Sequence, residues 1–148
     1  DCIVNAANEN LMPGGGVCGA IHQAAGQELA LECKRIGHCG VGEARITKGY
    51  HLKAKHVIHT IGPVWHGGEH GEDQYLFNCY KKSLLLATHH NIETIAFPNI
   101  STGIFSYPKD LAAETAIAAV TQHQNSGRSL KEVIFCCFDN DTCCNSWS

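Results

Sequence analysis

Residues 94–120 read TIAFPNISTGIFSYPKDLAAETAIAAV, and this stretch decides the fold class. Its opening residues, Thr94 to Phe97, are β-branched or apolar, which predicts a short strand. Pro108 then opens a helix, at a position that tolerates the missing N–H of proline. A strand that leads through a loop into a helix is the repeating unit of α/β proteins.

The same alternation continues in both directions along the chain. Apolar runs predict further strands at residues 1–5, 44–47, 56–61 and 133–138, and helical periodicity predicts further helices at 18–33 and 73–90. Near-continuously apolar strands between helices are typical of a sheet covered on both faces. We therefore expect an α/β protein, a three-layer α/β/α sandwich with a central mixed, largely parallel sheet. The expected inward faces of the helices are Ile21, Ala24, Ala25 and Leu29; Leu76, Tyr80, Ser83, Leu84 and Ala87; and Ala112, Thr115, Ala116, Ala119 and Val120.

Composition and charge limit the class of function. The chain has 148 residues, of which 44% are hydrophobic and 17% charged, as in an ordinary soluble globular domain. Its 11 basic and 14 acidic residues give a net charge of −3, which argues against a DNA- or RNA-binding protein. No apolar run reaches the roughly 20 residues of a membrane span, and no signal peptide opens the chain. We expect a cytoplasmic protein that does not contact membranes.

The two ends of the sequence look cut short. Asp1 is followed directly by an apolar run, so the first residues resemble the end of a buried strand. Residues 140–148 are polar and contain no terminating element. We expect residues 1–148 to form one domain that lacks its N-terminal strand or strands and its last C-terminal residues.

Nine cysteines raise the question of disulfides or a metal. A chain of this length and helix content does not depend on disulfides, and a reduced cysteine among apolar residues behaves as a small buried hydrophobe. The alternative is a zinc site at residues 33–39 or 143–144, but neither cluster has the paired C-x-x-C spacing of such sites. We therefore expect no metal. Buried thiols are expected at Cys2, Cys18, Cys33, Cys79 and Cys136.

A glycine-rich loop follows the opening strand and precedes the first helix. Gly14, Gly15 and Gly16 have no Cβ atoms, so backbone N–H groups there can approach an anion closely. The helix N-terminus adds a partial positive charge. The loop lacks the Gly-Lys-Ser/Thr of a P-loop and the G-x-G-x-x-G of dinucleotide-binding proteins. It is predicted to be a phosphate cradle, with a flexible turn as the alternative.

A second strand-to-helix loop, residues 98–108, strengthens this prediction. Ser101, Thr102 and Gly103 offer further N–H groups and two hydroxyls, and Phe105 offers an aromatic wall. Ligands of such sheets bind beyond the carboxyl ends of the strands. Two loops at that edge can hold the two phosphates of a diphosphate.

Polar side chains near the glycine loop are candidates for contacts with a sugar. The Asn8 amide donates and accepts hydrogen bonds, as the vicinal hydroxyls of a ribose require. The alternative for Asn8, and more so for Asn5, is that the side chain holds the turn together. His22 is a candidate general base, because the ordinary pKa of histidine is about 6.5, with a structural hydrogen-bonding role as the alternative. Glu69 is a candidate carboxylate, but its spacing does not place it near the ribose.

Four motifs in this order resemble the macrodomain family, and more narrowly its MacroD-type branch, which includes bacterial O-acetyl-ADP-ribose deacetylases. They are Val4 to Asn8, Gly14 to His22, Val57 to Pro63 and Ile100 to Phe105. Residues 62–69 and 73–84 add to the match, which runs from residue 1 to about residue 139. The resemblance implies a domain that binds ADP-ribose in a cleft, without a cofactor or a metal.

The resemblance also assigns residues to parts of the ligand. Asn8 would bond the distal ribose, Phe105 would pack on that ribose, and Phe138 would contact adenine. Asn5 belongs to the same ligand-binding motif as Asn8. The family's acidic residue that recognises the adenine amine precedes the first motif and lies outside this sequence. The diphosphate would lie between Gly14, Gly15, Gly16 and Val17 on one side and Ser101, Thr102, Gly103, Ile104 and Phe105 on the other.

Cys18 departs from the family pattern. Deacetylase-type members carry an aspartate at this place, at the helix start, where it positions or activates the attacking water. Three alternatives stay open: a thiolate with a catalytic role, a packing substitution in an enzyme whose water is held by Asn8 and activated by the substrate's phosphate, or a protein that binds without hydrolysis. Ser106, where many relatives have glycine, adds a side chain beside the diphosphate loop.

The expected function is hydrolysis of an ester at the distal ribose by a positioned water, with Asn8 and Cys18 as the catalytic candidates. The expected substrates are O-acetyl-ADP-ribose or proteins that carry mono-ADP-ribose on acidic side chains. One rival is a non-catalytic reader of ADP-ribose or of ADP-ribosylated proteins. The other rival, an RNA- or poly(ADP-ribose)-binding module, is disfavoured because the basic stripe with interleaved aromatics is missing.

Overall fold

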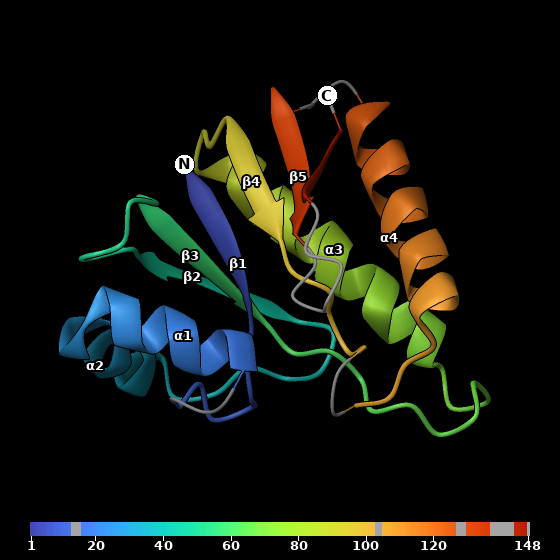
Figure 1. Ribbon diagram of the computed structural model, residues 1–148, viewed down its shortest axis with the longest axis horizontal. Helices are drawn as coiled ribbons and strands as arrows, with labels where there is room; N and C mark the ends of the chain where they lie inside the picture. The colour runs from blue at the N-terminus through green and yellow to red at the C-terminus, as the bar shows by residue number, and fades with distance from the viewer. Residues whose placement is uncertain (13–15, 103–104, 127–129, 137–143, 148) are drawn as a thin grey trace.

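The computed structural model describes residues 1–12, 16–102, 105–126, 130–136 and 144–147 of the chain. These residues form a six-stranded sheet with helices on both sides (Figure 1). The strand order in the sheet is β2-β3-β1-β4-β5-β6. The strands are β1 (Cys2–Ala6), β2 (Ala44–Lys48), β3 (His56–Thr60), β4 (Thr94–Phe97), β5 (Glu132–Cys136) and β6 (Cys144–Trp147).

The centre of the sheet is parallel. β1 pairs with β3, where Cys2 faces His56, and with β4, where Cys2 faces Ile95. β4 pairs in the same direction with β5, whereas the edge strands β2 and β6 run antiparallel to their neighbours. The expected mixed, largely parallel sheet is confirmed. Because neighbouring parallel strands point the same way, the carboxyl ends of β3, β1 and β4 lie along one edge.

Helices cover both faces of the sheet, which confirms the three-layer sandwich (Figure 1). On one face, two helices cover the sheet, and Ile21 of the first and Leu29 of the second belong to the same buried cluster as Val57 of the sheet. On the other face, two helices form a larger core with Leu84 and Phe97. The first pair is α1 (Gly16–Ala25) and α2 (Gln27–Ile36), and the second pair is α3 (Glu72–His89) and α4 (Lys109–Gln124).

The expectation of a single helix over residues 18–33 is wrong, because the chain forms two helices with a break at Gly26. Gly26 has a φ of 95°, in the left-handed region that favours glycine. The break leaves the carbonyl of Ala25 to accept a hydrogen bond from the N–H of His51. Ala24 is exposed rather than inward-facing, since the short α1 buries the row that contains Ile21 and Ala25.

The C-terminal segment also differs from expectation. The sequence predicts no element in residues 140–148, but β6 pairs with β5, with Trp147 facing Val133. The residues of β6 include no β-branched side chain, so their pattern alone does not indicate a strand. Cys136, at the end of β5, is half-buried rather than buried. The rest of the strand expected at 133–138, residues 137–138, lies outside the described residues.

The remaining expectations about the core are confirmed. The inward faces expected for α3 and α4 are buried, apart from the half-buried Thr115. The thiols of Cys2, Cys18, Cys33 and Cys79 are buried. In the part of the chain that the structure describes, no helix is both long enough and apolar enough to cross a bilayer.

Candidate functional site

The two loops selected from the sequence leave the sheet at the same edge (Figure 1). β1 and β4 are adjacent parallel strands, so residues 7–12 after β1 and residues 98–102 after β4 start side by side. The end of β3 lies on the other side of β1, where the Ala7 N–H donates to the Thr60 carbonyl at 2.9 Å. The ends of β3, β1 and β4 therefore converge at this edge.

Gly62, just beyond β3, packs against the loop that follows β4. A Cβ atom on Gly62 would lie 2.1 Å from Ser101 Oγ and 2.6 Å from Ile100 Cγ2, which is closer than real Cβ contacts allow. Only glycine therefore fits while the β4 loop keeps this position. Sequence reasoning gave Gly62 no role, because nothing in its spacing shows which loop it contacts.

Ser101 is both strained and buried. Its φ is 67°, in the left-handed region that residues other than glycine rarely adopt. The residue is 7% exposed, and its Oγ has no hydrogen-bond partner among the described residues. The Tyr107 N–H donates to the Ser101 carbonyl at 2.9 Å and closes the loop. A buried hydroxyl without a partner is uncommon in folded proteins.

The structure describes only some of the other residues predicted in this loop. Thr102 and Phe105 are half-buried, and the Phe105 carbonyl accepts a hydrogen bond from the Trp65 N–H at 2.9 Å. Ser106 is exposed and has a φ of 62°, a conformation that favours glycine. The predicted ligand residues Gly103, Ile104 and Phe138 lie outside the described residues.

Asn8 closes the first loop on itself. Its Nδ2 donates to the Met12 carbonyl at 2.7 Å, and its Oδ1 accepts from the Met12 N–H at 3.0 Å. This is the turn-holding role that the sequence left as the alternative, and a contact with ribose stays a prediction. In the glycine loop, Gly16 and Val17 form the first residues of α1, and Gly14 and Gly15 lie outside the described residues.

Polar side chains are buried between β1, β3 and α1. Asn5 on β1 is fully buried, with 3.0 Å between its Nδ2 and His59 Nδ1 on β3. The Asn5 amide also donates to Cys18 Sγ at 3.6 Å, and the Cys18 thiol donates to the Met12 carbonyl at 3.5 Å. On its other side, His59 Nε2 lies 2.9 Å from Thr47 Oγ1. The Asn5 Oδ1 has no partner within the described part of the chain.

Two buried imidazoles, His59 and His22, lie in this region. Burial lowers the pKa of His59 to about 4, with a smaller contribution from nearby His22, so the His59 ring is neutral at physiological pH. Burial also lowers the pKa of His22. Neither ring nitrogen of His22 has a hydrogen-bond partner among the described residues, so the structural role suggested for it is not seen there. The described residues also include no group of three or more His, Cys, Asp or Glu side chains that could hold a metal ion.

Glu72, at the start of α3, is a carboxylate whose role sequence reasoning missed. The residue is 2% exposed. Its two oxygens accept hydrogen bonds of 2.6–2.9 Å from the backbone N–H groups of His66, Gly68 and His70. The carboxylate therefore fixes the backbone of the segment that follows Trp65. Trp65 itself donates a hydrogen bond to Phe105 in the loop after β4. The signal available in the sequence was an acidic residue directly after a glycine-rich segment.

The charge of Glu72 predicts a pH-dependent stability. Burial raises the pKa of this carboxyl, but its backbone donors outweigh burial and lower the pKa from 4.5 to about 2. The charged form thus stabilises the fold fully above pH 4.5, and this stabilisation is lost as the pH falls toward 2. We expect Glu72→Gln to unfold at lower urea concentration than the wild type at neutral pH, with a difference that shrinks below pH 4.5.

The control for this prediction is Glu69→Gln, which changes an exposed carboxylate of the same segment. Glu69→Gln is expected to match the wild type at every pH. A loss of stability in Glu72→Gln that stays constant from neutral pH to about 2 would show that the carboxylate charge is not what holds the segment.

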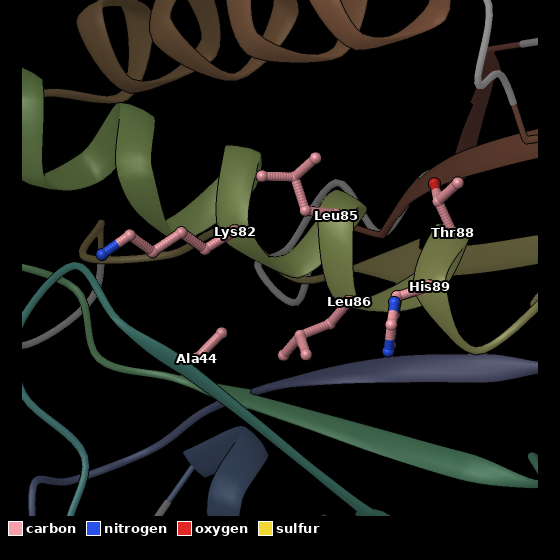
Figure 2. A pocket seen from close by; sticks show the side chains of 6 residues that line it. All are labelled: Ala44, Lys82, Leu85, Leu86, Thr88 and His89. Atoms are coloured by element: carbon pink, nitrogen blue, oxygen red, sulfur yellow. The ribbon is translucent and has the colours of Figure 1, made fainter.

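A groove of about 660 Å³ lies elsewhere on the molecule, between α3 and β2. Figure 2 shows side chains of α3, including Lys82 and His89, and Ala44 of β2 around it. A smaller cavity of about 260 Å³ is lined by residues of α3 and α4. The described residues that line these two cavities come from α3, α4 and β2, not from the described parts of the two loops.

Known proteins with similar sequences and structures define the family. The Macro domain family matches residues 4–116. A macro domain-containing protein of Chlorobaculum tepidum is 56% identical over 140 residues, which cover 95% of this chain and 81% of that protein. An O-acetyl-ADP-ribose deacetylase of Klebsiella pneumoniae is 51% identical over 146 residues, which cover 96% of this chain and 83% of that protein. The crystal structure of the Trypanosoma brucei macrodomain in complex with ADP-ribose has a TM-score of 0.87 at 40% identity, covering 95% of this chain and 59% of that one.

The chain belongs to the macrodomain family. The family match and the identity of about half of all positions to each relative confirm the resemblance that the four sequence motifs indicated.

Proposed function

We propose that this macrodomain binds ADP-ribose at the edge where β3, β1 and β4 end, and that it hydrolyses an ester on the distal ribose. The relative from Klebsiella pneumoniae carries the name of an O-acetyl-ADP-ribose deacetylase, and the Trypanosoma brucei structure contains ADP-ribose. The proposed substrates are O-acetyl-ADP-ribose and cytoplasmic proteins mono-ADP-ribosylated on acidic side chains.

The observation that carries this proposal is the convergence of two strand ends, β1 and β4, each with an unpartnered buried polar atom at or just after its carboxyl end. The Asn5 Oδ1 and the Ser101 Oγ are both buried and lack hydrogen-bond partners among the described residues. Both residues lie at the carboxyl edge of neighbouring parallel strands, β1 and β4, where ligands of open α/β sheets bind. Unpartnered buried polar atoms are rare in folded proteins, and a polar ligand bound at this edge would account for the pair.

In this proposal, each loop contacts a different side of the ligand. The N-terminus of α1 favours negative charge, and it supports a diphosphate on the side of the first loop. The second loop, residues 101–105, would hold the diphosphate from the other side, with Phe105 packed on the ribose. Asn8 would hold the distal ribose with the amide hydrogen and the Oδ1 lone pair that its two bonds to Met12 leave unused.

The proposed reaction is attack of a positioned water on the carbonyl carbon of the ester. The new bond forms between the water oxygen and this carbon, and the bond between the carbon and the ribose oxygen breaks. The ribose oxygen takes up the proton that the water loses, so the products are a carboxylic acid and ADP-ribose. Positioning the water against the ester removes much of the entropic barrier of such a reaction.

The experiment that tests the proposal is a calorimetric titration with ADP-ribose, followed by incubation with O-acetyl-ADP-ribose and measurement of acetate. Saturable binding of one ADP-ribose per chain and release of acetate are expected. Absence of binding at millimolar ADP-ribose would defeat the proposal as a whole.

Cys18 favours a second candidate function, that of a reader that binds ADP-ribose without hydrolysing it. The residue is 6% exposed, and its thiol donates a hydrogen bond to the Met12 carbonyl at 3.5 Å. A thiol in that bond is not placed to take a proton from water. Binding of ADP-ribose without release of acetate would select the reader.

A further inference from the structure

A continuous chain of hydrogen bonds crosses from the sheet through α1 to the first loop. It starts at Thr47 on β2 and ends at the turn that contains Asn8, the residue predicted to bind ribose. The side chains taken from the strands and from α1 are all buried, so water does not compete for these bonds. The chain links, in order, Thr47, His59, Asn5, Cys18, Met12 and Asn8.

The donors and acceptors along this chain fit one placement of the protons. The Thr47 hydroxyl donates to the Lys48 carbonyl at 3.2 Å, so its oxygen accepts from His59 Nε2 at 2.9 Å. His59 Nδ1 then carries no hydrogen, and it accepts from Asn5 Nδ2 at 3.0 Å. Because a neutral imidazole has one donor and one acceptor nitrogen, the bond to Thr47 selects the tautomer.

This tautomer sets the orientation of the Asn5 amide. One amide hydrogen is directed to His59 and the other to Cys18 Sγ, which leaves the thiol to donate to the Met12 carbonyl. A hydrogen on His59 Nδ1 would face the Asn5 amino group, and the amide would have to turn its oxygen toward the ring. Cys18 would then donate to that oxygen, and its bond to Met12 would be lost.

We propose that His59 is a positioning residue for the ligand site: its ring, oriented by Thr47, fixes Asn5 and Cys18 so that the turn from Asn8 to Met12 is held for the ligand. The choice of ADP-ribose as that ligand rests on the proposed function, whereas the hydrogen-bond chain does not. The titratable groups near the ring are Cys33, with Sγ 3.8 Å from Nε2, and His22, with a ring centroid 6.4 Å away.

The test compares His59→Leu with a matched variant, His123→Leu. His123 is also buried, and its Nε2 lies 2.9 Å from Thr88 Oγ1, so it forms a comparable His–Thr pair between α3 and α4. Both variants are expected to lower the free energy of unfolding. Only His59→Leu is expected to speed hydrogen exchange of the Met12 N–H and to raise the Kd for ADP-ribose about tenfold, equivalent to about 1.4 kcal/mol.

Further variants and one spectrum separate positioning from folding. Thr47→Val removes the acceptor of the Nε2 hydrogen at nearly constant volume, so it is expected to produce the same changes even if His59→Leu does not fold. His59→Gln keeps one acceptor and one donor and is expected to recover most of the affinity. In nitrogen NMR spectra of the wild type, His59 is expected to show a protonated Nε2 and an unprotonated Nδ1.

Several results would overturn the inference. These are wild-type Kd and Met12 exchange in Thr47→Val and in folded His59→Leu, equal losses of affinity in His123→Leu, or a proton on His59 Nδ1. If the wild type does not bind ADP-ribose, the proposed function fails by itself. Exchange at Met12 and the tautomer of His59 then still decide whether the ring positions the loop.

Discussion

A Gly62→Ala variant is expected to lose most of its affinity for ADP-ribose and about 1–3 kcal/mol of stability. The added Cβ would lie 2.1 Å from Ser101 Oγ and 2.6 Å from Ile100 Cγ2, so the β4 loop has to move. Ile100 is fully buried and Ser101 already has a strained φ of 67°, so neither residue has an easy alternative position. We expect calorimetry to show a Kd at least about tenfold higher, equivalent to about 1.4 kcal/mol.

The matched control is Gly40→Ala, which adds the same methyl group before β2. The nearest atoms to a Cβ there belong to the Glu43 side chain, with Oε2 at 3.3 Å, and a flexible carboxylate can move aside. Gly40→Ala is expected to keep the wild-type Kd. Wild-type affinity in Gly62→Ala would mean that the β4 loop does not contribute to the site.

A Cys18→Asp variant is expected to release acetate from O-acetyl-ADP-ribose about 10²–10⁴-fold faster than the wild type, the range of general-base catalysis. Cys18 lies in the first turn of α1, where the helix dipole favours a negative charge. Asn5 Nδ2, now 3.6 Å from the sulfur, offers a hydrogen bond that would orient the carboxylate. A carboxylate in this position accepts a proton from the attacking water, which the thiol bonded to Met12 does not.

Cys18→Asn separates the charge of the new side chain from its shape. It has nearly the same geometry as aspartate but accepts no proton, so no gain in rate is expected. Both variants face the Met12 carbonyl, 3.5 Å from the present sulfur, so the Kd for ADP-ribose is measured alongside the rate. Equal rates of acetate release in Cys18→Asp and Cys18→Asn would contradict a general base at this position.

Most strands and helices could be predicted from the spacing of apolar residues, because this spacing reflects which side chains are buried. The strand at residues 94–97 was predictable because a strand covered on both faces is a short apolar run. The inward row of α3 was predictable because its apolar residues recur with the helical period. The break at Gly26 was not, since apolar spacing continues across it and only the φ of 95° reveals the turn. β6 was not predictable either, because its pairing with β5 comes from the neighbouring strand rather than from its own residues.

For the candidate site, the sequence indicated which loops lie together but not how they contact each other. The strand-to-helix pattern placed Asn5 and Ser101 at the carboxyl ends of strands, and parallel pairing of β1 and β4 brought those ends together. The contact of Gly62 with Ser101 depends on how two loops pack, which spacing in one sequence does not encode. Glu72 follows a glycine-rich segment, but that position alone does not show that its carboxylate accepts hydrogen bonds from the backbone N–H groups of the segment.

We expect a nucleotide diphosphate to bind where β3, β1 and β4 end and not in the groove of Figure 2. A titration with ADP-ribose, followed by NMR of the 15N-labelled protein, distinguishes the two locations. The amide signals of Asn8, Gly62 and Ser101 are predicted to shift together with one Kd, while those of Lys82 and His89 stay in place. Shifts confined to the groove residues, with the three strand ends unchanged at saturation, would contradict the claim.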